Sequence, residues 1–523
     1  MPSYATGLSH KPLISQPSDV EARLESQKPI EELREEPIDS TRPSAEPEEM
    51  EKGQDYELID WLPNDPANPR NWSIGKKFFV TFEICFLTMS VYIGSAIYTA
   101  GLEYVILEYH VSETAALLGL TLFVIGYAVG PMLWSSMSEV PYFGRTNIYI
   151  LTLIVFVFFQ FGVIYAKNFG MLLAFRFLTG VFGSPVLATG GATVADMYVP
   201  RKQVYAMAMW GSSAVFGPAL GPLVGGFAAE NKGWRWTIWE LLWLSGFCLV
   251  FIMIFLPETS ASNILFRRAD RLRKRTGNTK LKTKGEVMAE QMTGHEAMMM
   301  VLVRPFTLSF FEPIVLILNL YIALVYSLLY LWFESFPLVF VDIYHFNTGT
   351  NGLAFLGLLV GSWIALPIFF WWVHKYLEPK FNANGELKPE YRIMPAMVGA
   401  FFIPACLFWF GWSARPSVHW IVPIIGSSLF SMGALCLFMS VLSYLGDAYP
   451  DYVASVYAGN DLFRSGVAAA FPLFANHMYK VLGLGWGSST LAFIGIAFIP
   501  IPFVLYRYGE RIRRMSKMAR HDF

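Results

Sequence analysis

Charged side chains are scarce in this sequence. Aspartate, glutamate, lysine and arginine make up 15% of its 523 residues, whereas 54% of the residues are hydrophobic. A soluble chain of this size would carry about 25% charged residues. The shortage argues against a soluble globular protein, and the net charge of −1 identifies no acidic or basic partner.

The residue patterns that build catalytic, metal or nucleotide sites are also missing. The eight histidines are scattered, mostly in expected loops, and no zinc-ligand spacing occurs. The Gly-x-x-x-x-Gly-Lys-Ser/Thr loop that cradles nucleotide phosphates is absent, so direct use of ATP is not expected. We therefore predict a protein that is not an enzyme and that uses neither a metal nor a bound cofactor.

Cysteine is equally rare. The four cysteines all fall inside apolar stretches, at positions 85, 248, 406 and 436. We expect them to act as small apolar fillers and to form no disulfides.

Long apolar runs, in contrast, recur along the whole chain. A run of about 18 apolar residues is long enough to cross a bilayer as a helix. We expect about twelve spans, at residues 78–99, 114–135, 147–166, 170–194, 203–229, 235–256, 314–341, 350–373, 393–412, 419–443, 453–480 and 486–507. The sequence therefore predicts an all-α integral membrane protein.

Polar segments divide these spans into two sets of six. Residues 1–75 are rich in Glu, Pro and Ser, and we expect a disordered tail there. A long basic segment, 257–313, separates a first half (76–256) from a second half (314–507), and residues 508–523 form a second tail. Six spans, a linker and six spans is the arrangement of a duplicated transporter.

Basic residues predict the orientation of the chain. They gather before the first span, in the central segment and after the last span, whereas most of the opposite loops are short and poor in Lys and Arg. Both termini and the central segment are therefore expected on the cytoplasmic side. The stretch RRADRLRKR, 267–275, is expected to contact anionic lipid, and nucleic-acid binding is not expected.

The fifth span contains GPALGPLVGG, residues 217–226. Gly217, Gly221 and Gly225 are each four residues apart, as are Pro218 and Pro222. Small residues at this spacing form a flat ridge that lets membrane helices approach closely. Two interpretations stay open: tight packing alone, or a surface along which two halves of the protein slide or seal.

Three stretches resemble signatures of the major facilitator superfamily. GSSAVFGPALGPLVGG, from Gly211 to Gly226, resembles the fifth-span signature of its antiporters, which is associated with export. AFRFLTGVFGSPVLATGGA resembles the fourth-span signature and implies a role in proton transfer for Arg176. GPMLWSSMSEVPYFGRT resembles the signature between spans two and three, with Glu139, Gly144 and Arg145 at its marked positions.

Further stretches narrow the resemblance and also show departures from it. DWLPNDPANPRNWS (60–73), PET (257–259) and KPEYR (388–392) look like fungal drug:proton antiporters with twelve spans. The branch that confers resistance to azoles, benomyl and methotrexate is the most similar. Ser135 and Val140 replace the glycine and arginine that are usual in the loop signature. The resemblance implies the major facilitator fold.

Ionisable residues within the spans are candidate functional groups, because charge is costly inside a membrane. Arg176 could favour loss of a proton from a nearby carboxylate, or could simply hydrogen-bond backbone carbonyls. Asp196 could pair with a base on a neighbouring helix or lie at the membrane interface. In span eleven, Asn460, Asp461 and Arg464 share a helix face. They could form a neutralised pair, or a cytoplasmic gate that faces the Glu139–Arg145 loop.

Span seven offers a candidate substrate face. Tyr326, Tyr330 and Glu334 are four residues apart, with Tyr321 and Phe333 nearby. Aromatic rings with one carboxylate suit planar, apolar and cationic molecules. Ordinary helix packing is the alternative.

These observations favour a monomeric, proton-coupled exporter in the plasma membrane that works by alternating access. Its expected substrates are varied toxic compounds, mostly apolar or cationic, and protons and lipid are its other partners. The alternative is an importer or facilitator of one nutrient, such as a polyamine, sugar or vitamin. A membrane enzyme or sensor is disfavoured by the scattered histidines and the short tails.

Overall fold

A computed structural model describes residues 56–523 except 292, 294–295, 297, 300–302, 383–384, 517 and 522–523. Residues 1–55 of the expected disordered tail, and parts of the central segment, thus lie outside the described residues.

Eleven described segments are long and apolar enough to cross a membrane. The last one, Ser455–Arg513, runs for 59 residues and contains both of the last two expected spans. Gly483 interrupts its helical geometry with a φ of +72°. The eleven segments therefore account for all twelve expected spans.

The first six spans begin and end within a few residues of the predicted positions. Their helices are α2 (Ile74–Ala96), α4 (Glu113–Glu139), α5 (Arg145–Ile164), α6 (Phe169–Gly183) with α7 (Pro185–Met197), α8 (Pro200–Lys232) and α9 (Trp234–Phe255). The short helix α3 (Leu102–Tyr109) follows α2 after the 3-10 turn η3 (Thr99–Gly101). Side chains cap several of these helices; Ser112 Oγ, for example, accepts the Ala115 N–H at the start of α4.

The second half repeats this plan. Its helices are α14 (Pro313–Phe340), α15 (Thr348–Ala354) with α16 (Leu356–Trp372), α17 (Met394–Ser413), α18 (Ile421–Ala448), α19 (Val453–Phe498) and α20 (Pro500–Arg513). Short helical turns connect them: η5 (Val373–Leu377), η6 (Glu378–Lys380), η7 (Pro389–Ile393) and η8 (Pro450–Tyr452).

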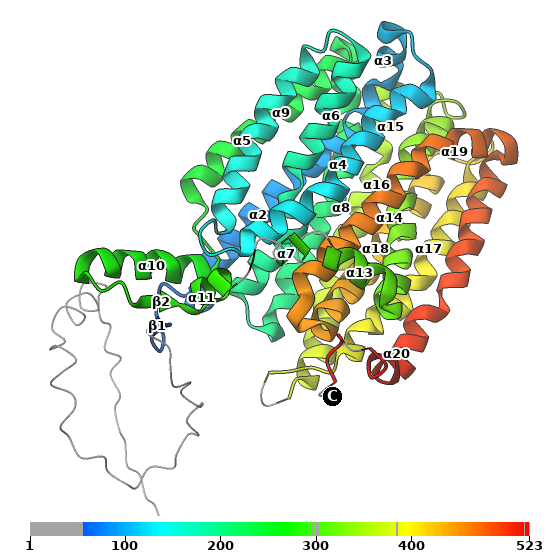
Figure 1. Ribbon diagram of the computed structural model, residues 1–523. Helices are drawn as coiled ribbons and strands as arrows, with labels where there is room; N and C mark the ends of the chain where they lie inside the picture. The colour runs from blue at the N-terminus through cyan, green and yellow to red at the C-terminus, as the bar shows by residue number, and fades with distance from the viewer. Residues whose placement is uncertain are drawn as a thin grey trace, which may run out of the picture. The chain divides into compact units, whose positions relative to one another are not determined.

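The two sets of helices lie side by side, the first from blue to green and the second from green to red in Figure 1. Helix α4 packs against α19, and α8 packs against α15, α16 and α18. Helix α7 also contacts α19, and these helix pairs contribute to the interface between the halves.

The glycine ridge of α8 faces α2, a helix of the same half. A Cβ at Gly217 would lie 2.6 Å from Tyr92 Cβ, and one at Gly221 would lie 2.7 Å from the Ile97 nitrogen. Such distances are too short for real side chains, so only glycine permits this approach. Gly217, Gly221 and Gly225 therefore pack within one half, which agrees with the first of the two interpretations, tight packing.

Other residues of the same stretch do reach the second half. A Cβ at Gly226 would lie 2.7 Å from the Thr348 carbonyl oxygen, and a Cβ at Gly211 would lie 2.1 Å from Met439 Cε. The Pro222 carbonyl oxygen would lie 2.3 Å from a Cβ at Gly352. Pro218 and Pro222 lie inside α8, and Pro218 is buried. The stretch therefore contacts α2 of its own half on one side and the second half on another.

Residues 56–75 have a defined structure, so the expected disorder is wrong for this part of the chain. Strand β1 (Glu57–Ile59) pairs in parallel with β2 (Leu281–Thr283) of the central segment. Asp65 Oδ2 accepts a hydrogen bond from Arg268 Nη1 at 2.6 Å. We call residues 56–73 the N-terminal strap. The central segment is more than a loop, since it also contains α10 (Ala261–Thr276), α11 (Lys284–Gln291) and α13 (Arg304–Phe311).

Candidate functional site

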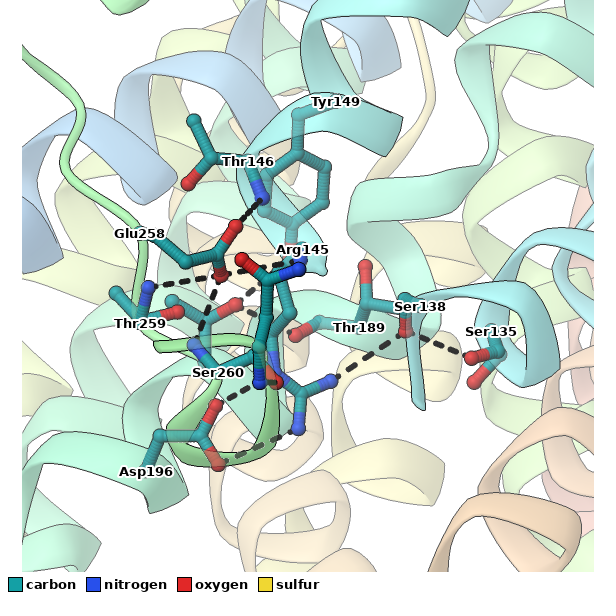
Figure 2. A network of polar contacts seen from close by, with 12 residues as sticks. Ser135, Ser138, Arg145, Thr146, Tyr149, Thr189, Asp196, Glu258, Thr259 and Ser260 are labelled. Carbon is teal, nitrogen blue, oxygen red and sulfur yellow. Dashed lines mark hydrogen bonds and ion pairs between the residues drawn. The ribbon is translucent and has the colours of Figure 1, made fainter. Parts of the chain in front are cut away.

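A buried network surrounds Arg145 at the start of α5 (Figure 2). Arg145 Nε donates to Asp196 Oδ2 at 2.5 Å, and Nη2 donates to Asp196 Oδ1 at 3.3 Å. Nη1 lies 3.5 Å from Ser138 Oγ, which in turn donates to the Ser135 carbonyl. Asp196 therefore pairs with a base on a neighbouring helix, one of its two predicted alternatives. Arg145 pairs with Asp196 rather than with Glu139.

Glu258 holds the backbone at the other side of Arg145. Its two carboxylate oxygens accept the N–H groups of Arg145 at 3.1 Å and Thr146 at 3.2 Å, the first turn of α5. A negative group at a helix N-terminus satisfies free N–H donors and opposes the positive end of the helix dipole. In the sequence, Glu258 is noted only as part of the stretch PET (257–259), and this contact was not predicted. Its position directly after a span end was the available signal.

Gly144 makes this approach possible. Its φ is +72°, and a Cβ there would lie 2.5 Å from Glu258 Oε2. The glycine of the predicted signature is thus required by both conformation and space.

A cavity of about 450 Å³ opens beside this network, between the two halves. We call it the vestibule. Its charged lining residues are Arg70, Glu139, Arg145, Asp196, Arg392 and Asp447. Arg70 belongs to the N-terminal strap, which places the vestibule on the strap's face of the protein.

The second half contributes a pair of the same kind to the vestibule. Arg392, just before α17, donates through Nε to Asp447 Oδ2, near the end of α18, at 2.8 Å. Arg145 and Asp196 occupy the equivalent places in the first half, at the start of its third span and the end of its fourth. Sequence reasoning did not identify Arg392 or Asp447 as site residues; the shared placement at span ends was the available signal.

Arg176 lies away from the vestibule and is fully buried. Nε donates to the Gly119 carbonyl at 2.9 Å, Nη1 to the Gly94 carbonyl at 2.9 Å, and Nη2 lies 3.5 Å from the Ser95 carbonyl. The guanidinium also stacks against Phe123 at 4.3 Å. These contacts are those of the backbone-bonding alternative, and they tie α6 to α2 and α4.

A second, smaller cavity of about 40 Å³ lies between the halves and has a mostly apolar lining. We call it the central cavity. It is lined by Tyr92, Trp210, Gly211, Ala214, Val215, Val325, Tyr326, Leu329, Phe430, Ala434, Leu435, Phe438, Met439, Leu442 and Arg464. A drug-sized ligand needs a pocket of several hundred Å³, so the halves must separate here before one can enter.

Arg464 and Asp461 form the neutralised pair that was one of their two predicted alternatives. Arg464 lines the central cavity and not the vestibule, so the other alternative, a gate with the Glu139–Arg145 loop, is corrected. Arg464 donates to Asp461 and, at 3.2 Å, to the Tyr92 hydroxyl on α2. Asn460 Nδ2 instead donates to Asn319 Oδ1 on α14 at 2.8 Å. Among the contacts of the described residues, none joins these three side chains to Glu139 or Arg145. The spacing of the three residues predicts that they share a helix face, but it does not predict how deep in the membrane they lie.

Of the five residues of α14 that were predicted to form a substrate face, one lines the central cavity and four do not. Tyr326 lines the central cavity, and Tyr330 lies beside it, donating to Ser95 Oγ at 3.2 Å. Phe333 packs against Phe355 and Tyr321 against Phe498, while Glu334 is buried. Tyr321, Tyr330, Phe333 and Glu334 are therefore not among the lining residues of this cavity.

Tyr92, Trp210 and Phe438 take the place of the excluded residues. They come from α2, α8 and α18, and sequence reasoning missed them because no pattern within one helix shows which helices meet.

The halves contact one another on the side opposite the vestibule. Thr121 Oγ1 of α4 donates to the Ala469 carbonyl of α19 at 3.0 Å. Glu230 Oε2 of α8 accepts the Gly349 N–H of α15 at 3.0 Å. Asn476 of α19 donates to Glu113 of α4. We call these contacts the outer seam.

Comparison with known proteins agrees with this architecture. Residues 84–472 match the family profile described as Major Facilitator Superfamily. The chain is 49% identical over 462 residues to Transporter mfs1 of Schizosaccharomyces pombe, covering 87% of each chain. It is 41% identical over 483 residues to Fluconazole resistance protein 1 of Saccharomyces cerevisiae, covering 91% of this chain and 87% of that one.

Solved structures share the fold at low identity. The proton:xylose symporter XylE aligns with a TM-score of 0.58 and 16% identity, covering 84% of this chain and 96% of that one. The profile match and the two fungal relatives cover most of the sequence. The chain belongs to the major facilitator superfamily.

Proposed function

We propose that this protein exports varied, largely apolar toxic compounds across the membrane in exchange for protons. The similarity to a fungal fluconazole resistance protein along 91% of the chain is the observation that carries the proposal. A largely aromatic and aliphatic cavity between the halves supports it, because such a lining suits apolar molecules.

Alternating access supplies the mechanism. The vestibule opens beside the strap while the outer seam closes the other side. Rocking of the halves would close the vestibule and part the outer seam, and so expose the central cavity to the opposite face. The basic residues on the strap's face support a cytoplasmic vestibule and cytoplasmic termini. The plasma membrane is the proposed location of this multi-pass protein. The protein would act as a monomer surrounded by lipid.

The proton gradient is the proposed energy source, with no bound cofactor. Asp196 lines the vestibule and forms an ion pair with Arg145. Protonation of this carboxylate would weaken the pair and free Arg145, so proton binding would be coupled to rearrangement of the vestibule. Arg176 holds the backbone of α2 and α4, so in this proposal it supports coupling by fixing helix positions.

The test is efflux of a fluorescent drug from cells that overexpress the chain, compared with empty-vector cells, at constant cellular ATP. Efflux that stops when a protonophore is added is the expected result. Efflux indifferent to the gradient contradicts proton coupling. Absence of efflux contradicts export and leads to screening for nutrient uptake.

A further inference from the structure

We propose that Arg464 determines substrate specificity in the central cavity. It donates a hydrogen bond to an acceptor atom of a neutral planar substrate and disfavours permanent cations. This role rests on the export function proposed above and narrows its substrate class.

The first observation is the charge of the lining. Among the described residues that line the central cavity, Arg464 carries the only formal charge. Asp461 is not among those lining residues. It lies within the protein, 2% exposed, and accepts from Arg464 through Oδ1. A ligand in the cavity therefore contacts the positive Arg464 side chain and not the negative Asp461 side chain.

The second observation is that each of the other polar side chains of the lining already has a hydrogen-bond partner. Trp210 Nε1 donates to Thr88 Oγ1 at 3.1 Å, and the Tyr92 hydroxyl accepts from Arg464 Nη2 at 3.2 Å. The Tyr326 hydroxyl lies 3.3 Å from that of Tyr330.

One nitrogen of the Arg464 guanidinium, Nη1, is available to a ligand. Its Nε and Nη2 donate to Asp461 and Tyr92. Nη1 makes no hydrogen bond in the part of the chain that the structure describes. Arginine carries five N–H donors and no acceptor, so the group it can bind is an acceptor such as a carbonyl oxygen or an unprotonated ring nitrogen.

The rings around Arg464 restrict ligand shape and charge further. The guanidinium lies 5.1 Å from the Tyr326 ring and 5.7 Å from the Phe438 ring. Arg464 thus already makes a cation–π contact with each of these rings, so a cationic ligand that approaches them meets a like charge. Planar neutral molecules can still stack against the aromatic side chains.

Two probes that differ only at one nitrogen provide the test: a neutral azole and its N-methyl azolium. Methylation removes the acceptor lone pair and adds a permanent positive charge. Equilibrium binding to the purified full-length protein in detergent is measured for each probe, for example by quenching of tryptophan fluorescence. We expect the azole to bind at least tenfold more tightly than the azolium.

Variants then test the residue. Arg464→Gln alone leaves Asp461 buried without its partner and can misfold, so the main variant is the double replacement Asp461→Asn with Arg464→Gln, which removes both charges at similar size. We expect it to reduce the azole preference to less than threefold. Arg415→Gln, an exposed arginine of the same half, is the control and should keep the full preference.

Three results would overturn the assignment. They are no azole binding to the unaltered protein, equal binding of both probes to it, or a preference that survives in the folded double variant. Because binding is measured without a gradient, loss of proton-driven efflux with the azole preference intact would contradict the proposed function and not the role of Arg464.

Discussion

At the scale of single residues, the buried arginines of this protein differ in what they hold. Arg145 pairs with a carboxylate beside the vestibule, and Arg464 pairs with one beside the central cavity. Arg176 is surrounded by carbonyl oxygens and aromatic rings instead. Arg176 therefore holds three helices together, whereas Arg145 lines the vestibule and Arg464 lines the central cavity.

Replacing Arg176 by alanine should reduce both stability and transport. The change leaves a void and removes the donors to Gly94 and Gly119, at a cost of about 2–4 kcal/mol. We expect a lower melting temperature of the purified protein and at least tenfold slower efflux per molecule at the cell surface. Lys167→Ala, an exposed basic residue of the preceding loop, is the control. An Arg176→Ala protein with unchanged melting temperature and transport would contradict this role.

At the scale of elements, α8 is one of the helices that contact both halves. Its glycine ridge packs closely on α2, while Pro222 and Gly226 meet α15. The same helix therefore packs closely on its own half and also contacts the other half.

Gly221→Leu should disrupt α8. Any Cβ at this position would lie 2.7 Å from the Ile97 nitrogen, and backbone atoms cannot move aside as a flexible side chain can. We expect a destabilisation of about 3 kcal/mol or more, seen as a strongly reduced amount of folded protein by size-exclusion chromatography. Gly246→Leu in α9 is the matched control, because a Cβ there meets nothing within 4 Å. Equal yields from the two variants would disprove the close packing of α8 on α2.

The N-terminal strap is a second element whose attachment can be tested. A Leu58→Cys, Lys282→Cys pair, whose residues are partners in the β1–β2 register, should form a disulfide under mild oxidation. Asp65→Asn should slow this reaction, because it weakens the ion pair with Arg268.

Acid should have the same effect on the strap. Burial alone would raise the pKa of Asp65, but the hydrogen bonds from Arg268 and Ala67 outweigh it and hold that pKa below 3.8. A carboxylate whose pKa is lower in the docked state stabilises docking when the pH is above its pKa in the unfolded chain. That stabilisation is lost as the pH falls through the pKa of the docked state. Docking should therefore persist at neutral pH and weaken below about pH 4. Hydrogen exchange of β1 measures this, and undiminished protection at pH 3 would contradict it.

At the scale of the whole molecule, the halves form a seam on one side and a vestibule on the other. Contacts also cross near the vestibule, where Lys202 Nζ of α8 donates to Glu378 Oε1 of η6 at 2.6 Å. The outer seam is the part that must open if the central cavity is to reach the other face.

A disulfide across the outer seam should stop transport. Thr121 and Ala469 lie on different halves and are joined by a 3.0 Å hydrogen bond. In a background without the native cysteines, Thr121→Cys with Ala469→Cys should lose efflux on oxidation and regain it with a reductant. Each single cysteine should be insensitive to both treatments. Full transport by the cross-linked protein would exclude alternating access through this seam.

The sequence by itself determined the spans, their order and their division into two halves. Each apolar run is long enough to enter the bilayer and each polar segment stays outside it, whatever the rest of the chain does. It also indicated Arg145, Asp196 and the glycines of α8. Tertiary structure alone decided that Asp196 pairs with Arg145, that Glu258 caps α5, and that Arg464 lies at the central cavity. Helical periodicity defines a face of one helix, but which neighbour covers that face, and at what depth, depends on packing between residues far apart in the chain.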